Sequence, residues 1–171
     1  MGELDLLKPT IERALGGTIH FGRVSIKPGK PITFATVPFK DNDGKRQEKV
    51  IFALPGNPAS AAVCFYAFVL PSLHQSSGVS PPGLPRLKVI LDHDMQLDRA
   101  RTEYQRVVVV AKSDGRLYVS STGGQRSSRI GSFKGANALI ILPPGEGTAK
   151  KGEVVDALLM GKLLSDFMPS Y

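Results

Sequence analysis

A segment rich in proline, glycine and serine divides this sequence into two stretches with different local patterns. Residues 76–85 read Ser-Ser-Gly-Val-Ser-Pro-Pro-Gly-Leu-Pro, a composition typical of turns and linkers. Helical periodicity occurs only before this segment, whereas the apolar runs after it are short and bounded by turn residues. The sequence therefore predicts an α/β region followed by an all-β domain, with the boundary inside this segment.

Before the boundary, the pattern predicts two helices and three strands. One helix is expected at Leu6–Leu15, with Gly16 as its stop. The other is expected at Pro58–Leu70, which is apolar on nearly every side and should therefore be buried. The strands are expected at Thr18–Ile26, Ile32–Val37 and Lys49–Leu54. The polar stretch Lys40–Glu48 would be a solvated loop between the last two strands.

After the boundary, short β-type runs alternate with Gly, Pro, Asp and Ser, which indicates a small β-barrel or sandwich-like domain. Asp114–Gly115 is a good hairpin turn between two of these runs. The expected strands are Arg86–Leu91, Tyr104–Ala111, Arg116–Ser121, Ala138–Leu142 and Val154–Met160.

The positive net charge is consistent with anionic partners and equally with a basic surface that only aids solubility. The chain of 171 residues carries a net charge of +7, which attracts anions without choosing among them. Aromatic residues are only 7%, tryptophan is absent and no dense basic stripe occurs, so small oxyanions fit better than nucleic acid. No apolar run approaches the ~20 residues of a membrane span. The single cysteine, Cys64, cannot form an internal disulfide, and a reducing cytoplasm is the expected location.

The first candidate site is the turn Lys27-Pro28-Gly29-Lys30-Pro31. The prolines fix φ and the glycine permits a tight turn, so the loop should present two ammonium groups on a stiff backbone. Lysine is a compact charge that suits an oxyanion. The alternative is a basic turn that binds no ligand.

The second candidate joins a strand to the apolar helix through Pro55, Gly56, Asn57, Pro58 and Ser60. Asn57 suits the N-cap and Pro58 the first helical position. A helix start offers unpaired N–H donors and partial positive charge, which together bind anions. The alternative is plain capping of the helix.

Two weaker candidates follow the boundary. Arg101 and Arg106 flank Glu103, which is also consistent with an ordinary ion pair at a strand edge. The loop at 121–129 combines hydroxyls, glycines and arginines and could cradle an oxyanion, or could be a plain surface loop. Near the N-terminus, Glu3 and Asp5 could bind a divalent ion, although such carboxylates are usually solvated. No phosphate-binding loop, zinc spacing or Ser-His-Asp motif is present.

Together, in this order, these segments resemble the molybdenum insertase family, which includes bacterial MoeA, the plant insertase and the E domain of gephyrin. The eukaryotic, gephyrin-like branch looks closest. The matching motifs run nearly the whole length: Met1-Gly2-Glu3-Leu4-Asp5, His20-Phe21-Gly22-Arg23-Val24, Lys27-Pro28-Gly29-Lys30-Pro31, residues 52–60, Glu103-Tyr104-Gln105-Arg106, Ser121-Thr122-Gly123, Ser127-Ser128-Arg129, Ala136-Asn137-Ala138 and Gly152-Glu153-Val154-Val155.

The resemblance implies a fold, an activity and partners. Residues 1–78 would be the rear part of a three-layer α/β molybdopterin-binding domain, and residues 79–171 the family's small C-terminal β-barrel-like domain. The chain would then be a C-terminal fragment. The implied enzyme is a molybdopterin molybdenumtransferase that inserts molybdate into adenylylated molybdopterin with Mg²⁺. The full-length protein would be a cytoplasmic homodimer without a nucleic-acid partner or a membrane span.

The resemblance also implies roles for particular residues. Lys27, Lys30 and Asp5 would be catalytic, and Asp5 would also lie near the metal. The implied substrate-binding residues are Pro28, Gly56, Asn57, Pro58, Ser60, Arg101, Ser127, Ser128 and Arg129. The chain departs from many relatives at Thr102, Gln105 and Arg126, and the last of these weakens the match of its loop. A non-catalytic gephyrin-like scaffold, or an anion- or nucleic-acid-binding fragment, remains an alternative.

Overall fold

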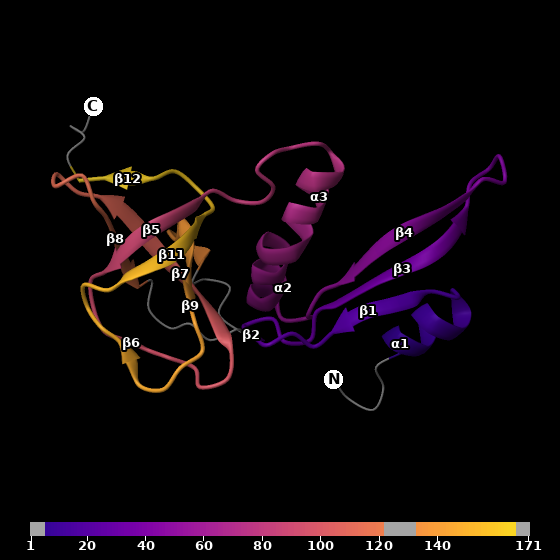
Figure 1. Ribbon diagram of the computed structural model, residues 1–171, viewed down its shortest axis with the longest axis horizontal. Helices are drawn as coiled ribbons and strands as arrows, with labels where there is room; N and C mark the ends of the chain where they lie inside the picture. The colour runs from indigo at the N-terminus through magenta and orange to yellow at the C-terminus, as the bar shows by residue number, and fades with distance from the viewer. Residues whose placement is uncertain (1–5, 122–132, 167–171) are drawn as a thin grey trace.

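The computed structural model describes residues 6–121 and 133–166. Figure 1 shows a helical rod standing between a small antiparallel sheet, built from the first part of the chain, and a β-barrel, built from the last part. No helix in the described part of the chain is long and apolar enough to cross a membrane.

The chain enters through a short helix and a three-stranded sheet. Helix α1 (Leu7–Pro9) continues in a π-helical turn, Thr10–Ala14. The two together lie within the helix predicted at Leu6–Leu15. The sheet has the order β1-β3-β4 and is antiparallel, with β1 at Thr18–Gly22, β3 at Thr33–Lys40 and β4 at Arg46–Ala53.

The expected strand at Thr18–Ile26 is wrong, because it is two strands with different partners. Strand β1 ends at Gly22, and Arg23 then adopts φ 66°, which breaks the extended chain. Strand β2 (Ile26–Lys27) leaves the first sheet and pairs in parallel with β7 (Thr102–Ala111) of the barrel. Val24 N–H donates to the Lys30 carbonyl at 3.0 Å, which closes the segment that contains β2.

The expected loop at Lys40–Glu48 is also largely wrong. Strands β3 and β4 pair without interruption out to Lys40↔Arg46. The turn is tight because the Asp41 carboxylate accepts hydrogen bonds from the N–H groups of Asp43 and Lys45, at 3.1 and 2.7 Å. Most of this ribbon's distal half is exposed, so hydrophobic alternation could not reveal it.

The apolar helix is longer and less buried than the sequence predicted. Helix α2 (Pro58–Cys64) runs through a π-helical turn, Phe65–Val69, into α3 (Leu70–Ser76). The rod therefore continues past Leu70, where the predicted helix ended, as far as Ser76. Phe65 and Leu73 are exposed, because only the sheet and the barrel cover the rod within the described residues (Figure 1).

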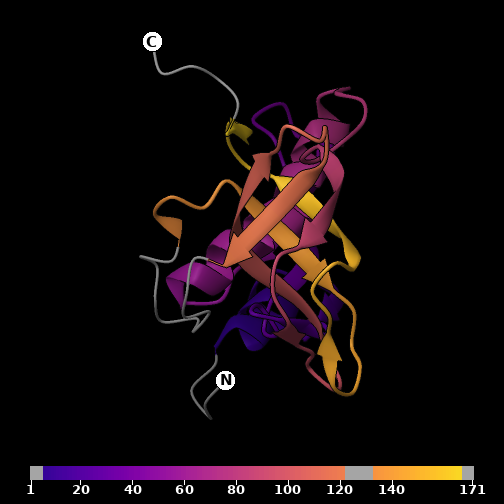
Figure 2. The same ribbon diagram turned by 90° about the vertical axis from the view of Figure 1, so that its left-hand side faces the viewer.

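The last part of the chain closes into a five-stranded barrel, which confirms the expected barrel-like fold. Its strands are β5 (Arg86–Leu91), β7, β8 (Leu117–Ser121), β9 (Ala138–Leu142) and β11 (Val154–Leu159). They pair in the closed order β7-β8-β5-β11-β9-β7, and the view from the barrel side shows these strands crossing around one core (Figure 2). Short strands β6 (Met95–Gln96) and β10 (Thr148–Ala149) pair with each other, and β12 (Leu164–Ser165) pairs in parallel with the end of β7.

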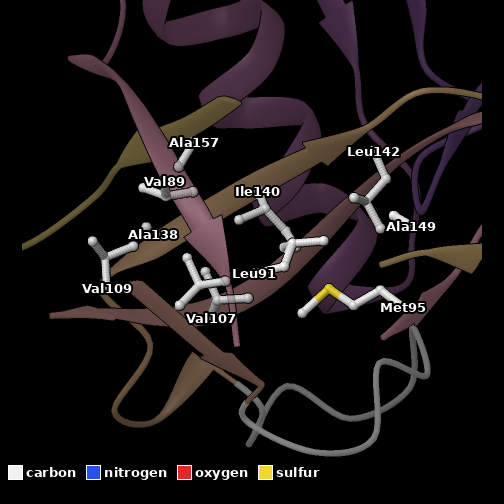
Figure 3. Close-up of a cluster of buried hydrophobic side chains, with 11 residues drawn as sticks. Val89, Leu91, Met95, Val107, Val109, Ala138, Ile140, Leu142, Ala149 and Ala157 are labelled. Carbon is white, nitrogen blue, oxygen red and sulfur yellow. The ribbon is translucent and has the colours of Figure 1, made fainter. Parts of the chain in front are cut away.

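The barrel core is apolar and continuous. Its side chains, among them Val107, Ile140 and Met95, converge from the surrounding strands (Figure 3). At its rim, the buried Asn137 side chain accepts a hydrogen bond from Val109 N–H and donates to the carbonyls of Val109 and Lys162. These bonds tie β7 to the segment that leads into β12.

Candidate functional site

The candidate site lies where the first part of the chain joins the barrel. Strand β2 adds to the edge of β7 in the register Ile26↔Thr102 and Lys27↔Glu103. Thr102 N–H donates to the Ser25 carbonyl at 3.1 Å. This pairing delivers the start of the two-lysine turn directly to the barrel (Figure 1).

The two-lysine turn packs against helix α2. Pro28 and Gly29 are buried, whereas Lys30 is exposed, and the Lys27–Pro28 peptide bond is cis. The Cys64 thiol donates to the Gly29 carbonyl at 3.5 Å, and burial raises the pKa of this thiol to about 11. Cys64 lies one turn beyond Ser60 on the same helix face, so the turn and the helix start are neighbours.

The start of α2 has the geometry expected of an N-cap. Asn57 has an extended backbone, and its side-chain oxygen accepts from Ser60 N–H at 3.5 Å. Pro58 occupies the first turn and is exposed, whereas Ser60 is 6% exposed. A Cβ on Gly56 would meet no atom within 4 Å, so there is open space beside the helix start. Plain capping accounts for this geometry, and it leaves room for a ligand as well.

Four charged side chains meet beside the two-lysine turn. The Lys27 ammonium lies 3.4 Å from Glu103 Oε1 and 3.6 Å from Asp98 Oδ2. Arg101 Nη2 lies 2.7 Å from the same Asp98 oxygen. Arg101 thus pairs with Asp98, while the buried Glu103 pairs with Lys27 and also acts electrostatically on Arg106. Ion pairs at the strand edge, the alternative named above, account for these contacts as well.

Asp98 is a residue that the sequence reasoning missed. Its Oδ1 accepts from the N–H groups of Ala100 and Arg101, each at 3.1 Å. The hydrogen bond from Arg101 is the main cause that lowers the pKa of Asp98 to about 2, and Lys27 adds a smaller electrostatic contribution. The Asp-x-x-Arg spacing is a sequence signal for such a turn, but the nearby lysine is invisible in it.

A further arginine, Arg106 in β7, is fully buried. The Arg106 guanidinium lies 5.6 Å from the centre of the Phe133 ring, at a distance typical of a cation–π contact. Burial lowers the pKa of Arg106, and the carboxylate of Glu103 acts in the opposite direction.

Four of the expected site residues lie outside the described residues: Asp5, Ser127, Ser128 and Arg129. The approach of the 121–129 loop to the site therefore stays a prediction. Within residues 6–121 and 133–166, no group of three His, Cys, Asp or Glu side chains could hold a metal ion. Asp5, the expected ligand of Mg²⁺, lies outside these residues, so the Mg²⁺ site stays a prediction.

Comparison with known proteins agrees with this architecture. Residues 1–75 match the family described as a probable molybdopterin binding domain, and residues 88–160 match the MoeA C-terminal region (domain IV). The molybdopterin biosynthesis MoeA protein of Pyrococcus horikoshii shares the fold, with a TM-score of 0.64 at 24% identity over 92% of this chain and 35% of that chain.

Curated relatives extend the match in sequence. Gephyrin of Dictyostelium discoideum is 43% identical over 95% of this chain and 24% of its own length. The molybdenum cofactor synthesis protein cinnamon of Drosophila melanogaster is 42% identical over 100% of this chain and 27% of its length. The molybdopterin molybdenumtransferase of Haemophilus influenzae is 31% identical over 91% of this chain and 36% of its length. The chain thus spans about a quarter to a third of these relatives, and it belongs to the molybdenum cofactor biosynthesis family of MoeA and gephyrin.

Proposed function

We propose that this chain provides part of the molybdate site of a molybdopterin molybdenumtransferase, which inserts molybdate into adenylylated molybdopterin. One observation carries the proposal: cations from the two parts of the chain, Lys27 and Arg101, converge on one carboxylate. Relatives at about 30% identity bear the name molybdopterin molybdenumtransferase. The activity is proposed for the full-length protein.

Each group at the junction has a proposed task in holding a tetrahedral dianion. Lys27 and Arg101 supply positive charge from β2 and from the residue before β7, and charge-assisted hydrogen bonds to an oxyanion are the strong ones. Lys30 presents a second, exposed ammonium from the same stiff turn. Ser60 and the capped start of α2 supply hydroxyl and N–H donors beside the turn.

Packing at the junction keeps these donors in place and keeps water from one side of them. Ile26, Ile32 and Cys64 form a buried cluster against which Phe52, Phe68 and Tyr104 pack. This cluster joins sheet, helix and barrel directly beneath the turn. Preorganised charge in a partly dehydrated site stabilises an anion more than the same charge in water does. The homodimer, the cytoplasmic location and the Mg²⁺ site at Asp5 belong to the same proposal.

The test is molybdenum insertion by the full-length protein carrying Lys27→Ala. We expect the rate of cofactor formation to fall by about 10²-fold, as when one preorganised electrostatic contact is removed from an active site. The rate is compared per folded molecule, because the substitution takes the Lys27 ammonium away from the buried Glu103 carboxylate and so lowers the melting temperature as well. The matched control is Lys45→Ala at the exposed hairpin turn, which should insert molybdenum at the unaltered rate. Normal insertion by the Lys27 variant would overturn the site assignment.

A further inference from the structure

The Asp98 side chain is held by a set of donors of the kind that an oxyanion requires. One of its oxygens accepts from two backbone N–H groups, those of Ala100 and Arg101, both at 3.1 Å. The other oxygen lies 2.7 Å from Arg101 Nη2 and 3.6 Å from Lys27 Nζ. A guanidinium, an ammonium and two amides thus surround one carboxylate.

Most of the positive charge at this point is already neutralised in the structure. Lys27 and Arg101 lie against the carboxylates of Asp98 and Glu103, and the buried Arg106 interacts electrostatically with Glu103. An incoming dianion would therefore meet two carboxylates, and like charges at close range repel. Tight binding requires that one of the carboxylates leaves the cations.

Of the two carboxylates, Asp98 is the one that can move. Glu103 lies within β7, is 5% exposed and is paired in register with Lys27. Asp98 lies in the connection between β6 and β7, and its side chain is 13% exposed. Its backbone carbonyl accepts from Gly145 N–H at 2.9 Å. The main chain is thus fixed at this point, and a rotation of the side chain alone would release all four donors.

We propose that the Asp98 carboxylate is an internal substitute for the oxyanion, which occupies its position in the ligand-free protein and is displaced when the oxyanion binds. This inference rests on the proposed function and concerns the same site. While no substrate is present, the Asp98 carboxylate keeps Lys27 and Arg101 ordered and paired. It also sets a threshold, because a ligand must offer the donors more charge and more acceptor atoms than a single carboxylate does. Molybdate meets this threshold, whereas chloride does not.

The test is molybdate binding by isothermal titration calorimetry on the full-length protein with Asp98→Asn. The amide oxygen can still accept from the two backbone N–H groups, but the charge that competes for Lys27 and Arg101 is gone. We expect the Kd for molybdate to fall by about tenfold, and the Kd for chloride to fall as well, because both anions compete with the same carboxylate. Asp98→Ser, which also retains a small acceptor, should act in the same direction if the Asn variant folds poorly.

Asp94→Asn is the matched control. Asp94 also pairs with a lysine, Lys150 at 2.8 Å, and its carboxylate also accepts from a backbone N–H, that of Lys151. The substitution changes the net charge equally but involves Lys150 and Lys151 in place of Lys27 and Arg101, so the Kd for molybdate should stay unchanged. An equal fall in the Kd for molybdate in both variants would show a general effect of net charge and would overturn the inference.

Other outcomes separate this inference from the proposed function. One outcome is that the unaltered protein binds molybdate, that Lys27→Ala abolishes binding, and that folded Asp98→Asn binds no more tightly. The proposed site would then stand, and the proposed displacement of the Asp98 carboxylate would be refuted. Asp98 would then be a positioning residue for Arg101. If neither the unaltered protein nor any variant binds molybdate, both proposals fail.

Discussion

Gly29 sets the distance between the two-lysine turn and the helix. Its φ is 121°, and a Cβ at this position would lie 2.6 Å from Cys64 Sγ and 2.8 Å from Ile26 Cδ1. The close approach puts the turn against α2, one helical turn from Ser60. A single hydrogen atom in place of a side chain therefore decides whether Lys27 and the helix start can act on one ligand.

Gly29→Ala should therefore damage both stability and the site. The unfavourable backbone conformation and the contact with Cys64 should lower the free energy of unfolding by about 1–3 kcal/mol. Urea unfolding measures this directly. Gly44→Ala, at a positive φ of 77° but with no atom within 4 Å of its Cβ, separates the two causes. Equal losses in the two variants would mean that the contact with Cys64 contributes nothing.

Asn137, at the rim of the barrel core, is a second residue whose replacement should lower the free energy of unfolding. Its amide satisfies both backbone groups of Val109 and the Lys162 carbonyl, at 2.6 to 2.9 Å. Asn137→Ala would leave buried backbone groups without partners, which costs about 1–3 kcal/mol each. Thermal unfolding should show a loss of at least about 2 kcal/mol, since more than one group is affected. A loss below half of this would mean that water replaces the amide.

Two cations predicted from the sequence lie together in the structure, but the carboxylate between them was not predicted. Lys27 and Arg101 were chosen from local patterns, and the structure places them on one carboxylate. Asp98 was overlooked because its role depends on a contact with a residue far away in the chain. Local spacing could indicate the turn at Asp98, but only the β2–β7 pairing reveals that Lys27 reaches it.

At the scale of elements, β7 organises the molecule. It pairs with β8 and β9 inside the barrel, with β12 at one end and with β2 at the other. The barrel strands were predicted well, because each contains a short run of apolar or β-branched residues and is bounded by turn residues. The break at Arg23 and the two-residue strand β2 were not predicted. Neither a single positive φ nor a two-residue pairing with a strand far along the chain leaves a pattern of apolar residues in the sequence.

The β5–β11 pair contributes a dependence of stability on pH. Hydrogen bonds from Arg86 and then Lys88 lower the pKa of Asp156 to about 2, against about 3.9 in an unfolded chain. A carboxyl with a lowered folded pKa stabilises the fold fully above the unfolded value, and the contribution is lost as pH falls from about 4 to about 2. Asp156→Asn should therefore lower stability at pH 7 and have little effect near pH 2.

Urea unfolding at a series of pH values between these limits checks this expectation. Stability of the Asn variant should fall less steeply with decreasing pH than that of the unaltered chain. Arg86→Gln should flatten the curve in the same way, because it removes the main cause of the lowered pKa. Parallel curves for all three proteins would show that the ion pair contributes nothing to folding.

At the scale of the whole molecule, the two parts of the chain are joined by the β2–β7 pairing and by the cluster around Ile26, Ile32 and Cys64. The candidate site lies on this joint, so its geometry depends on both parts. Apolar side chains such as Phe65 and Leu73 are exposed on the helical rod. The chain spans 24% of the Dictyostelium relative and 36% of the Haemophilus relative, so the proposed activity is placed in a longer protein.

The central claim is that an oxyanion binds where the two-lysine turn, the start of α2 and Arg101 meet. A crystal of the full-length protein grown with molybdate, examined by anomalous diffraction at the molybdenum edge, tests it most directly. We expect a molybdenum peak in contact with Lys27 and Arg101, beside Ser60, with the Asp98 carboxylate turned away. A fully occupied peak elsewhere, with Asp98 still bound to Arg101 at an empty junction, would contradict it.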